Sequence, residues 1–238
     1  MKAWIVTRYG GPEVLELAEV PTPVPVRDEV LIRVHATTVT AGDRRVRAMD
    51  APPGFGFIFP LLFGRERPKQ PILGSEVAGV VEATGPEVTR YKAGDRVFAY
   101  SDTRMKGHAE YLAIPEAAAV WHMPAGMDFT EAATLSFGPC TALTFLKKTR
   151  LRRGQRVLVN GASGNVGSAA VQLAKYMGGH VTAVTSRANK KLARAIGADE
   201  VIDYAAQDFT RAGQRWDVVF DAVGNLTFAG SRSALARN

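Results

Sequence analysis

The chain lacks several features that would place it in whole classes of protein. Its 238 residues include one cysteine, Cys140, which excludes a disulfide framework and a cysteine-based zinc cluster. The opening residues MKAWIVTRYGG have no long apolar core of the kind that a signal peptide carries. No stretch reaches the roughly twenty apolar residues that a membrane helix needs. These absences predict a cytoplasmic protein with no membrane partner.

The charge is basic, with a formal net charge of +7. The basic residues are spread along the chain, apart from a modest cluster between Lys147 and Arg156. A basic balance alone is weak evidence for nucleic-acid binding, so the sequence does not favour a nucleic-acid partner. A polyanionic cofactor would account for part of the excess.

Two regions differ in the period of their apolar residues. Residues 1 to about 120 hold short β-branched runs separated by turn signals such as YGGPE and TGPE, a pattern typical of a β-domain. From about Asp128 the pattern becomes helical, with a start near Thr130 and two helices broken at Gly138-Pro139. We therefore expect a β-rich domain over residues 1–125 and a second domain over residues 126–238.

The second region alternates strands and helices. Strands are predicted at RVLVN, HVTAVT, EVIDY and WDVVFD, with helices after the first two. Such alternation indicates parallel crossovers, and so an α/β fold with a partial Rossmann domain and a parallel sheet. We expect the fourth strand to lie at an open edge, because a six-stranded Rossmann sheet would need two more units. The sequence is therefore either an incomplete copy of a longer protein or a truncated product.

A glycine-rich turn follows the first of these strands. Gly161 permits the tight exit from the strand, Gly164 lets the backbone approach a pyrophosphate, and Gly167 lets the next helix pack against the sheet. The pyrophosphate would lie on the free N–H groups at the start of that helix. Dinucleotide binding is the favoured interpretation over a purely structural turn, and the same stretch adds three residues to the predicted site: Ser163, Asn165 and Val166.

The end of the second strand indicates which dinucleotide is bound. NAD sites usually place a carboxylate there for the ribose hydroxyls. This chain has Ser186 and Arg187, followed by Lys190 and Lys191. Hydroxyl and cationic groups suit a 2′-phosphate, so NADP(H) is favoured over NAD(H). The alternative is a solvated helical turn, although cations at a helix start oppose its dipole.

Several motifs together carry a family resemblance. They are GSEVAGVVEATGPEVTRYKAGDRVFAY, AEY at residues 109–111, TAL at residues 141–143 and NGASGNVG. With them the chain resembles the medium-chain dehydrogenase/reductase superfamily, in particular its zinc-independent quinone-oxidoreductase-like branch. The resemblance implies an N-terminal chaperonin-10-like catalytic domain, as in alcohol dehydrogenases, and a Rossmann domain that binds NADP.

The resemblance also implies a reaction without zinc. Thr40 and Ser75 stand where zinc-dependent members carry their Cys and His ligands, and two hydroxyls make a poor zinc site. Zinc-free relatives pass hydride from the nicotinamide to a quinone or an α,β-unsaturated carbonyl, and the enolate that forms needs a hydrogen-bond donor. Thr40 and Asp43 are then the candidate catalytic residues, although relatives often have Asn at the first position.

Further cofactor contacts follow from the same resemblance. Thr141 is expected near the nicotinamide, and Tyr204 beside the adenosine ribose. The turn formed by Ala222, Val223 and Gly224 is expected to pass under the cofactor. The alternatives are a helix N-cap for Thr141 and surface packing for Tyr204.

Other functions stay open at this point. The chain would also fit a non-catalytic NADPH-binding protein, a regulatory or nucleic-acid-binding protein, or an inactive truncated fragment. A homodimer is expected only of a longer parent, because family members use their C-terminal part for it. The apolar loop from Pro52 to Gly64 would line a substrate pocket, cover the cleft as a lid, or pack on the β-domain.

Overall fold

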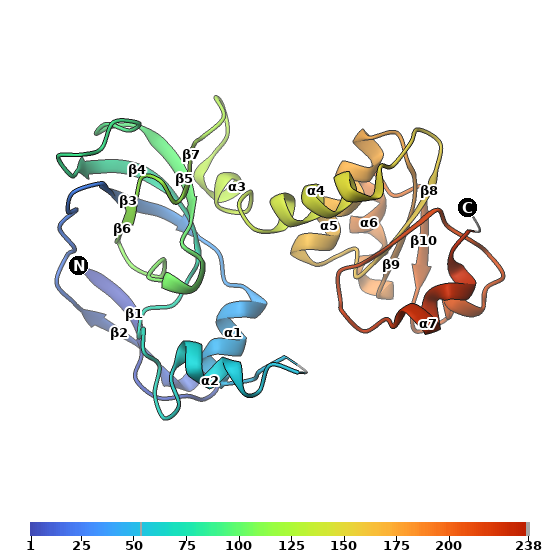
Figure 1. The fold of residues 1–238 in the computed structure, drawn as a ribbon, viewed down its shortest axis with the longest axis horizontal. Helices are drawn as coiled ribbons and strands as arrows, with labels where there is room; N and C mark the ends of the chain where they lie inside the picture. Colours follow the sequence, from blue (N-terminus) through green and yellow to red (C-terminus); the bar gives the residue numbers. More distant parts are fainter. Residues whose placement is uncertain (53, 237–238) are drawn as a thin grey trace. The chain divides into compact units, whose positions relative to one another are not determined.

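The structure is a computed structural model that describes residues 1–52 and 54–236 (Figure 1). The chain forms two units, Met1–Ser136 and Phe137–Asn238. The division falls after the helix α3 (Phe129–Ala133), whose Ala132 and Ala133 pack with Ala78 of a strand in the first unit. The first unit therefore extends beyond residue 125, where the sequence places the boundary.

The first unit is built on antiparallel strands, as the sequence predicts. Five strands pair in the order β6-β3-β4-β5-β7, and β1 and β2 form a separate hairpin. Alternate side chains such as Val30 and Ile32 enter a buried apolar cluster inside the sheet. The strands are β1 Lys2–Val6, β2 Leu15–Glu19, β3 Glu29–Thr37, β4 Glu76–Thr84, β5 Arg96–Tyr100, β6 Tyr111–Pro115 and β7 Ala119–His122.

Two helices of the first unit pack beside the hairpin. Val46 of α1 (Ala41–Ala48) and Phe59 of α2 (Ile58–Phe63) share a buried cluster with Val6 and Leu73. The segment predicted as an irregular apolar loop thus contains a short helix with one buried face. Pro53 of that loop lies outside the described residues.

The second unit has the predicted parallel sheet. Its strands are β8 (Arg156–Asn160), β9 (His180–Thr185), β10 (Glu200–Asp203) and β11 (Val218–Asp221), in the order β10-β9-β8-β11. The outer position of β11 is also as predicted. A parallel bridge between Trp216 and Leu235 lies just before that strand begins.

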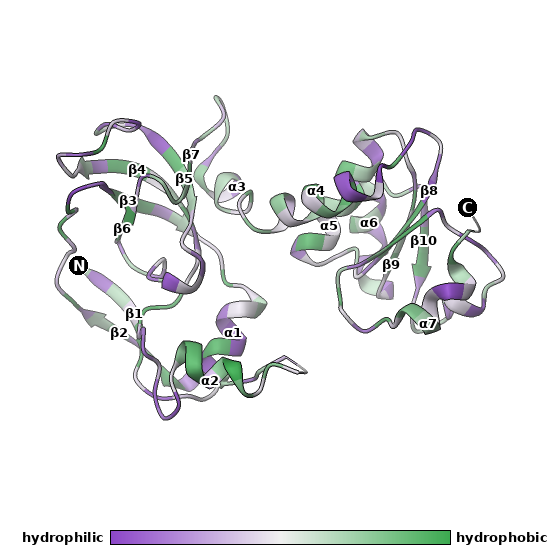
Figure 2. Cartoon of the chain, viewed as in Figure 1, coloured by the Kyte–Doolittle hydropathy of each residue, from purple (hydrophilic) through white to green (hydrophobic). Residues whose placement is uncertain are grey.

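The two faces of this sheet carry different cores. Val157 and Val159 of β8 point to a cluster with helices α4, α5 and α6, whereas Leu158 between them points to a cluster with Trp216 and Phe209. Burial on both faces explains why these strands read as continuous apolar runs, which Figure 2 shows as green ribbon. The helices are α4 Gly138–Thr149, α5 Asn165–Tyr176, α6 Lys190–Ala195 and α7 Phe228–Ser231.

The helical region between the units differs in detail from the prediction. The first helix is capped by Asp128 rather than Thr130, through a capping box with Glu131. The helices are separated by residues 134–137, and Gly138 and Pro139 open the second helix instead of breaking the chain. Proline fits there because the first helical N–H groups have no partner within the helix.

None of the helices over residues 1–52 and 54–236 is both long and apolar enough to cross a membrane.

The double-sided packing of β8 generates a stability prediction. Leu158→Ala should lower the free energy of unfolding by about 2–5 kcal/mol, because it leaves a cavity in a fully buried site. Leu192→Ala, at an exposed position of α6, is the matched control and should change it by less than about 1 kcal/mol. Urea unfolding of both variants measures the difference, and equal effects would contradict the assigned core.

Candidate functional site

The carboxyl edge of the parallel sheet gathers polar side chains. Each of the four strands ends on one: Asn160, Thr185, Asp203 and Asp221. Ligands of open α/β sheets bind outside this edge. The sequence analysis missed all four residues, although a polar residue that closes a buried apolar run was a usable signal.

The glycine-rich turn has the geometry expected for a pyrophosphate. Gly161 has a φ of +78°, which favours glycine. A Cβ on Gly167 would lie 2.1 Å from the carbonyl oxygen of Gly161, so only glycine lets α5 approach the turn this closely. Gly164 is the N-cap of α5 and no side chain caps this end, where Asn165 and Val166 begin the helix. Its first N–H groups are therefore available to an anion.

The predicted 2′-phosphate residues lie at the ends of β9 and β10. Ser186 follows β9 directly, and Asn189 donates a 3.3 Å hydrogen bond to its hydroxyl. Arg187 is exposed, and no ion pair forms on its guanidinium within the described part of the chain. The Lys190 ammonium lies 3.9 Å from the Asp203 carboxylate, which offsets part of its charge.

Ser163 and Tyr204 both form hydrogen bonds to Thr185, at the end of β9. The Thr185 hydroxyl donates a 3.0 Å hydrogen bond to the Ser163 hydroxyl, which joins the glycine-rich turn to the end of β9. The Tyr204 N–H donates to the Thr185 carbonyl, and the Tyr204 ring is 64% exposed. An exposed ring in this position is an available stacking surface rather than a packed one.

Thr141 lies within α4. The N-cap of this helix is Phe137, so the alternative role of Thr141 as an N-cap is wrong. Its N–H donates to the Phe137 carbonyl at 2.9 Å. Near the start of the helix, a Cβ on Gly138 would lie 2.1 Å from the Asn165 side-chain oxygen, which places the first turn of α4 against the start of α5.

The turn after β11 is organised by Asp221. Its carboxylate accepts hydrogen bonds from the N–H groups of Val223, Gly224 and Leu226 at 3.0–3.1 Å. It also accepts one from the Asn160 amide, which bonds Asn225 as well. Burial alone would raise the pKa of Asp221, but these hydrogen bonds outweigh it and lower the pKa.

This turn lies against the glycine-rich turn. A Cβ on Gly161 would come within 2.6 Å of a Val223 methyl carbon and 3.7 Å of the Ala222 carbonyl carbon. Gly224 has a φ of +78°, a backbone conformation that glycine adopts readily. The predicted Ala222–Gly224 turn thus borders the predicted pyrophosphate turn.

In the first unit, Thr40 and Asp43 form a capping box at the start of α1. The Thr40 hydroxyl and N–H both donate to one carboxylate oxygen of Asp43 at 2.7 Å, and the Asp43 N–H donates to the hydroxyl. The other carboxylate oxygen accepts from the Gly74 N–H at 3.0 Å. Asp43 is buried and held on both oxygens, so it positions Thr40.

A second buried carboxylate holds the chain just before Thr40. Glu76 is fully buried and accepts hydrogen bonds from the hydroxyls of Thr38 at 2.7 Å and Ser136 at 2.9 Å. Tyr100 pairs with Glu76 across the sheet and donates to Asp102. Burial, with the nearby carboxylates, raises the pKa of Tyr100 to about 12, so its phenol keeps its proton at neutral pH. The sequence analysis missed both Glu76 and Tyr100.

The donor set at the expected zinc position does not fit zinc. The Thr40 hydroxyl is engaged with Asp43, and Ser75 offers another neutral hydroxyl where thiolate or imidazole ligands are needed. Over residues 1–52 and 54–236, no three His, Cys, Asp or Glu side chains form a group that could hold a metal. Independence from zinc stays a prediction.

The Asp221 network generates a prediction that depends on pH. Asp221→Asn should destabilise the chain by about 1–3 kcal/mol at neutral pH, because the hydrogen bonds lose a charged acceptor. A lowered pKa means that the carboxylate's contribution is present above its unfolded pKa and is lost as the pH falls through the folded value. The difference between wild type and variant should therefore shrink on acidification below about pH 4.

Urea unfolding at several pH values measures this difference. Glu16→Gln, at an exposed position of β2, is the control and should show a change of under about 0.5 kcal/mol. An Asp221→Asn effect that stays constant from neutral to acid pH would contradict the assigned network.

Comparison with known proteins agrees with this geometry. The alcohol dehydrogenase GroES-like domain family matches residues 26–130, and the zinc-binding dehydrogenase family matches residues 165–238. The quinone oxidoreductase of Pseudomonas aeruginosa is 37% identical over 237 residues, which cover 96% of this chain and 68% of that protein. The chloroplastic NADPH-dependent alkenal/one oxidoreductase of Arabidopsis thaliana is 34% identical, over 94% of this chain and 58% of that protein.

Among solved structures, the quinone oxidoreductase of Coxiella burnetii superposes with a TM-score of 0.87 at 30% identity, over 99% of this chain and 73% of that chain. The chain spans about three fifths of the length of several curated relatives that it matches. Its fold is thus a GroES-like domain joined to a Rossmann-like domain with a parallel sheet. The chain belongs to the medium-chain dehydrogenase/reductase superfamily, within its quinone oxidoreductase-like branch.

Proposed function

We propose that this chain binds NADPH through its second unit and reduces quinones or α,β-unsaturated carbonyls without zinc. The observation that carries the proposal is the exposed Arg187 guanidinium at the end of β9, beside Ser186 and Lys190. A cation at this position suits a 2′-phosphate, whereas NAD sites use a carboxylate there.

Different residues of the second unit would bind different parts of the cofactor. The start of α5 binds the pyrophosphate, and Gly161 and Gly167 keep the backbone close enough for it to do so. Tyr204 stacks beside the adenosine ribose, and Asp221 keeps the following turn in shape. Thr141, in the first turns of α4, contacts the nicotinamide. When bound, NADPH supplies the hydride.

The first unit supplies one hydroxyl group, that of Thr40, for the substrate oxygen. The Thr40 O–H donates to Asp43 in this structure, so it would turn from that carboxylate to the substrate oxygen when a substrate binds. The segment before Thr40 is held by Glu76. Catalysis then rests on orientation and hydrogen bonding more than on a strong acid.

Two observations support the substrate class. The relatives' names specify quinones and alkenals or alkenones. The first unit has a cavity of about 550 Å³ that reaches Asp43 and has mostly apolar walls, including Trp4, Leu17 and Val34. Such a lining suits the apolar body of a quinone or enone.

The direct test is a titration of the purified chain with NADPH and NADH, followed by a simple quinone and then a simple enone. We expect NADPH to bind more tightly, and its absorbance to fall when either acceptor is added. Binding without oxidation would instead support a non-catalytic NADPH-binding protein. Salt-sensitive affinity for nucleic acid without turnover would support a nucleic-acid-binding role.

Arg187→Gln tests the cofactor preference. We expect the Kd for NADPH to rise about 10- to 100-fold, because a charge-assisted hydrogen bond to the phosphate is lost. The Kd for NADH should stay unchanged. Arg194→Gln, an exposed arginine on the neighbouring α6, is the matched control. Equal weakening of both cofactors in Arg187→Gln would show that this residue does not read the 2′-phosphate.

Thr40→Val tests the hydroxyl in the first unit. We expect kcat to fall about 10-fold or more through loss of a hydrogen-bond donor, with the Kd for NADPH unchanged, while Thr40→Ser keeps most activity. The lost N-cap costs about 1 kcal/mol of stability. Thr227→Val removes the N-cap of α7 and controls for that loss. If Thr40→Val and Thr40→Ser have the same kcat, Thr40 only caps its helix.

A further inference from the structure

The short helix α2 and the residues before it expose large apolar side chains. Phe57 is 86% exposed and Leu61 66%, and three neighbours are also exposed. We define the α2 patch as these five residues: Phe55, Phe57, Ile58, Leu61 and Leu62. Figure 2 shows the helix as one of the most apolar parts of the first unit. Contiguous exposed apolar residues usually mark an interaction site.

The opposite side of the same helix fixes the patch in place. Phe59 and Phe63 lie one turn apart with ring centres 4.7 Å from each other, and Phe59 packs into the cluster that holds Val46 and Leu73. The Tyr9 hydroxyl contacts the carbonyls of Phe63 and Gly64 at 2.9–3.0 Å. A helix that is apolar on all sides needs an apolar neighbour on its second face too.

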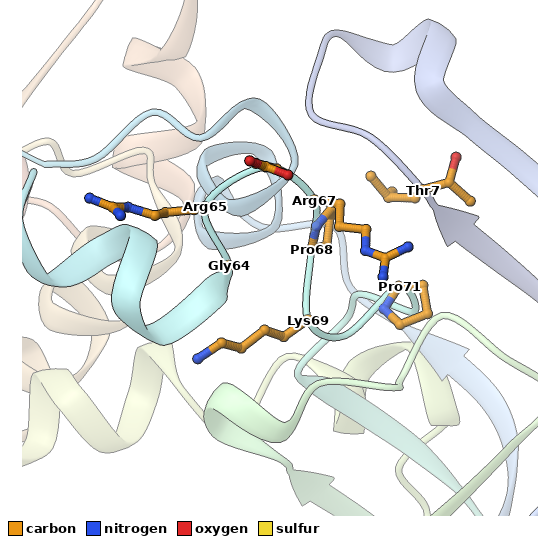
Figure 3. Close-up of a pocket in the computed structure, with 9 residues that line it drawn as sticks. Thr7, Gly64, Arg65, Arg67, Pro68, Lys69 and Pro71 are labelled. Atoms are coloured by element: carbon orange, nitrogen blue, oxygen red, sulfur yellow. The ribbon is translucent and has the colours of Figure 1, made fainter.

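A basic loop follows the helix immediately. Arg65, Arg67 and Lys69 are exposed, with Glu66 as the one acidic residue among residues 64–71. The Lys69 ammonium donates to the Leu61 carbonyl, which places a cation at the edge of the α2 patch. In Figure 3, Arg65 and Lys69 extend on one side of the loop and Arg67 on the other, towards Pro71. No ion pair forms on these three cations within the described residues.

From this juxtaposition we propose that the α2 patch and its basic loop form a docking surface for an anionic lipid bilayer. Exposed Phe and Leu side chains enter the boundary between headgroups and acyl chains, and nearby Arg and Lys attract anionic headgroups. The chain then lies on the bilayer and does not cross it. The sequence analysis expects no membrane partner because no stretch is long and apolar enough to span a bilayer. The proposed contact lies on the bilayer surface instead, and its cations come from the loop beside the helix.

The charge of the loop argues against a second copy of the chain as the occupant. A symmetric dimer through the α2 patch would place the basic loop of one copy near that of the other. Like charges at such a contact oppose association. An anionic surface satisfies both the apolar side chains and the cations.

Flotation of the full chain with vesicles tests the proposal. We expect the chain to float with vesicles that contain about one third phosphatidylglycerol, and roughly tenfold less with pure phosphatidylcholine vesicles. Raising the salt to about 0.5 M should weaken the binding, because exposed charges are screened. The assay needs no cofactor or substrate, so its outcome is separate from that of the proposed reductase activity.

Two variants assign the binding to this surface. Phe57→Ser with Leu61→Ser should abolish flotation, and Arg65→Gln with Arg67→Gln should weaken it by about fivefold per charge. The matched control is the double variant Val24→Ser with Tyr176→Ser, which changes two exposed apolar residues outside the α2 patch. It should float like the wild type. Circular dichroism confirms that the variants fold.

Three outcomes would overturn the proposal. They are equal flotation with anionic and neutral vesicles, no flotation at all, and full flotation of the α2 patch variant. Concentration-dependent dimerisation that Leu61→Ser abolishes, without any flotation, would instead assign the patch to a second copy. The proposal is supported if the control variant, Val24→Ser with Tyr176→Ser, floats like the wild type while the variant with Phe57→Ser and Leu61→Ser does not float.

Discussion

The second unit depends on a close approach between two glycines. A Cβ on Gly167 would lie 2.1 Å from the Gly161 carbonyl oxygen, so any other residue would push α5 away from β8. That contact sets where the open end of α5 lies relative to the strand ends. The polar residues that close β9 and β11 then bond around it, Thr185 to Ser163 and Asp221 to Asn160. This steric constraint and the hydrogen bonds between strand ends together shape the carboxyl edge at β8, β9 and β11.

The first unit uses buried carboxylates for a comparable purpose. Asp43 and Glu76 both accept hydrogen bonds on each side-chain oxygen. Together they hold the segment from Thr38 to Thr40 at the start of α1. Buried carboxylates are retained only when hydrogen bonds compensate for lost solvation, and here those bonds fix the orientation of the Thr40 hydroxyl.

The proposed reductase activity and the proposed lipid contact use different parts of the chain. The cofactor binding that we propose would use Arg187, Tyr204 and the start of α5 in the second unit. The proposed lipid contact would use α2 and residues 65–69 in the first unit. Because quinones are often apolar molecules, a docking surface on a bilayer would bring the chain to where such substrates partition.

The sequence by itself determined the strands of the parallel sheet, the glycine-rich turn and the family. These depend on local pattern: continuous apolar runs, and glycines spaced by three where backbone atoms approach. It also located Ser186 and Arg187, because they directly follow a recognisable strand; their role toward a 2′-phosphate stays a prediction. The helix boundaries near Gly138 were wrong, since Gly-Pro suits a helix start as well as a break.

Only the tertiary structure decided which distant residues meet. Asp221 with Asn160, Glu76 with Thr38 and Ser136, and Lys190 with Asp203 are each separated by many residues, and nothing in local spacing pairs them. The same holds for the face that α2 exposes, because a helix apolar on all sides carries no periodic signal of which side is buried. Local sequence pattern determines where the helices and strands form. Which distant side chains meet is determined by how these elements pack, and that packing depends on the whole fold.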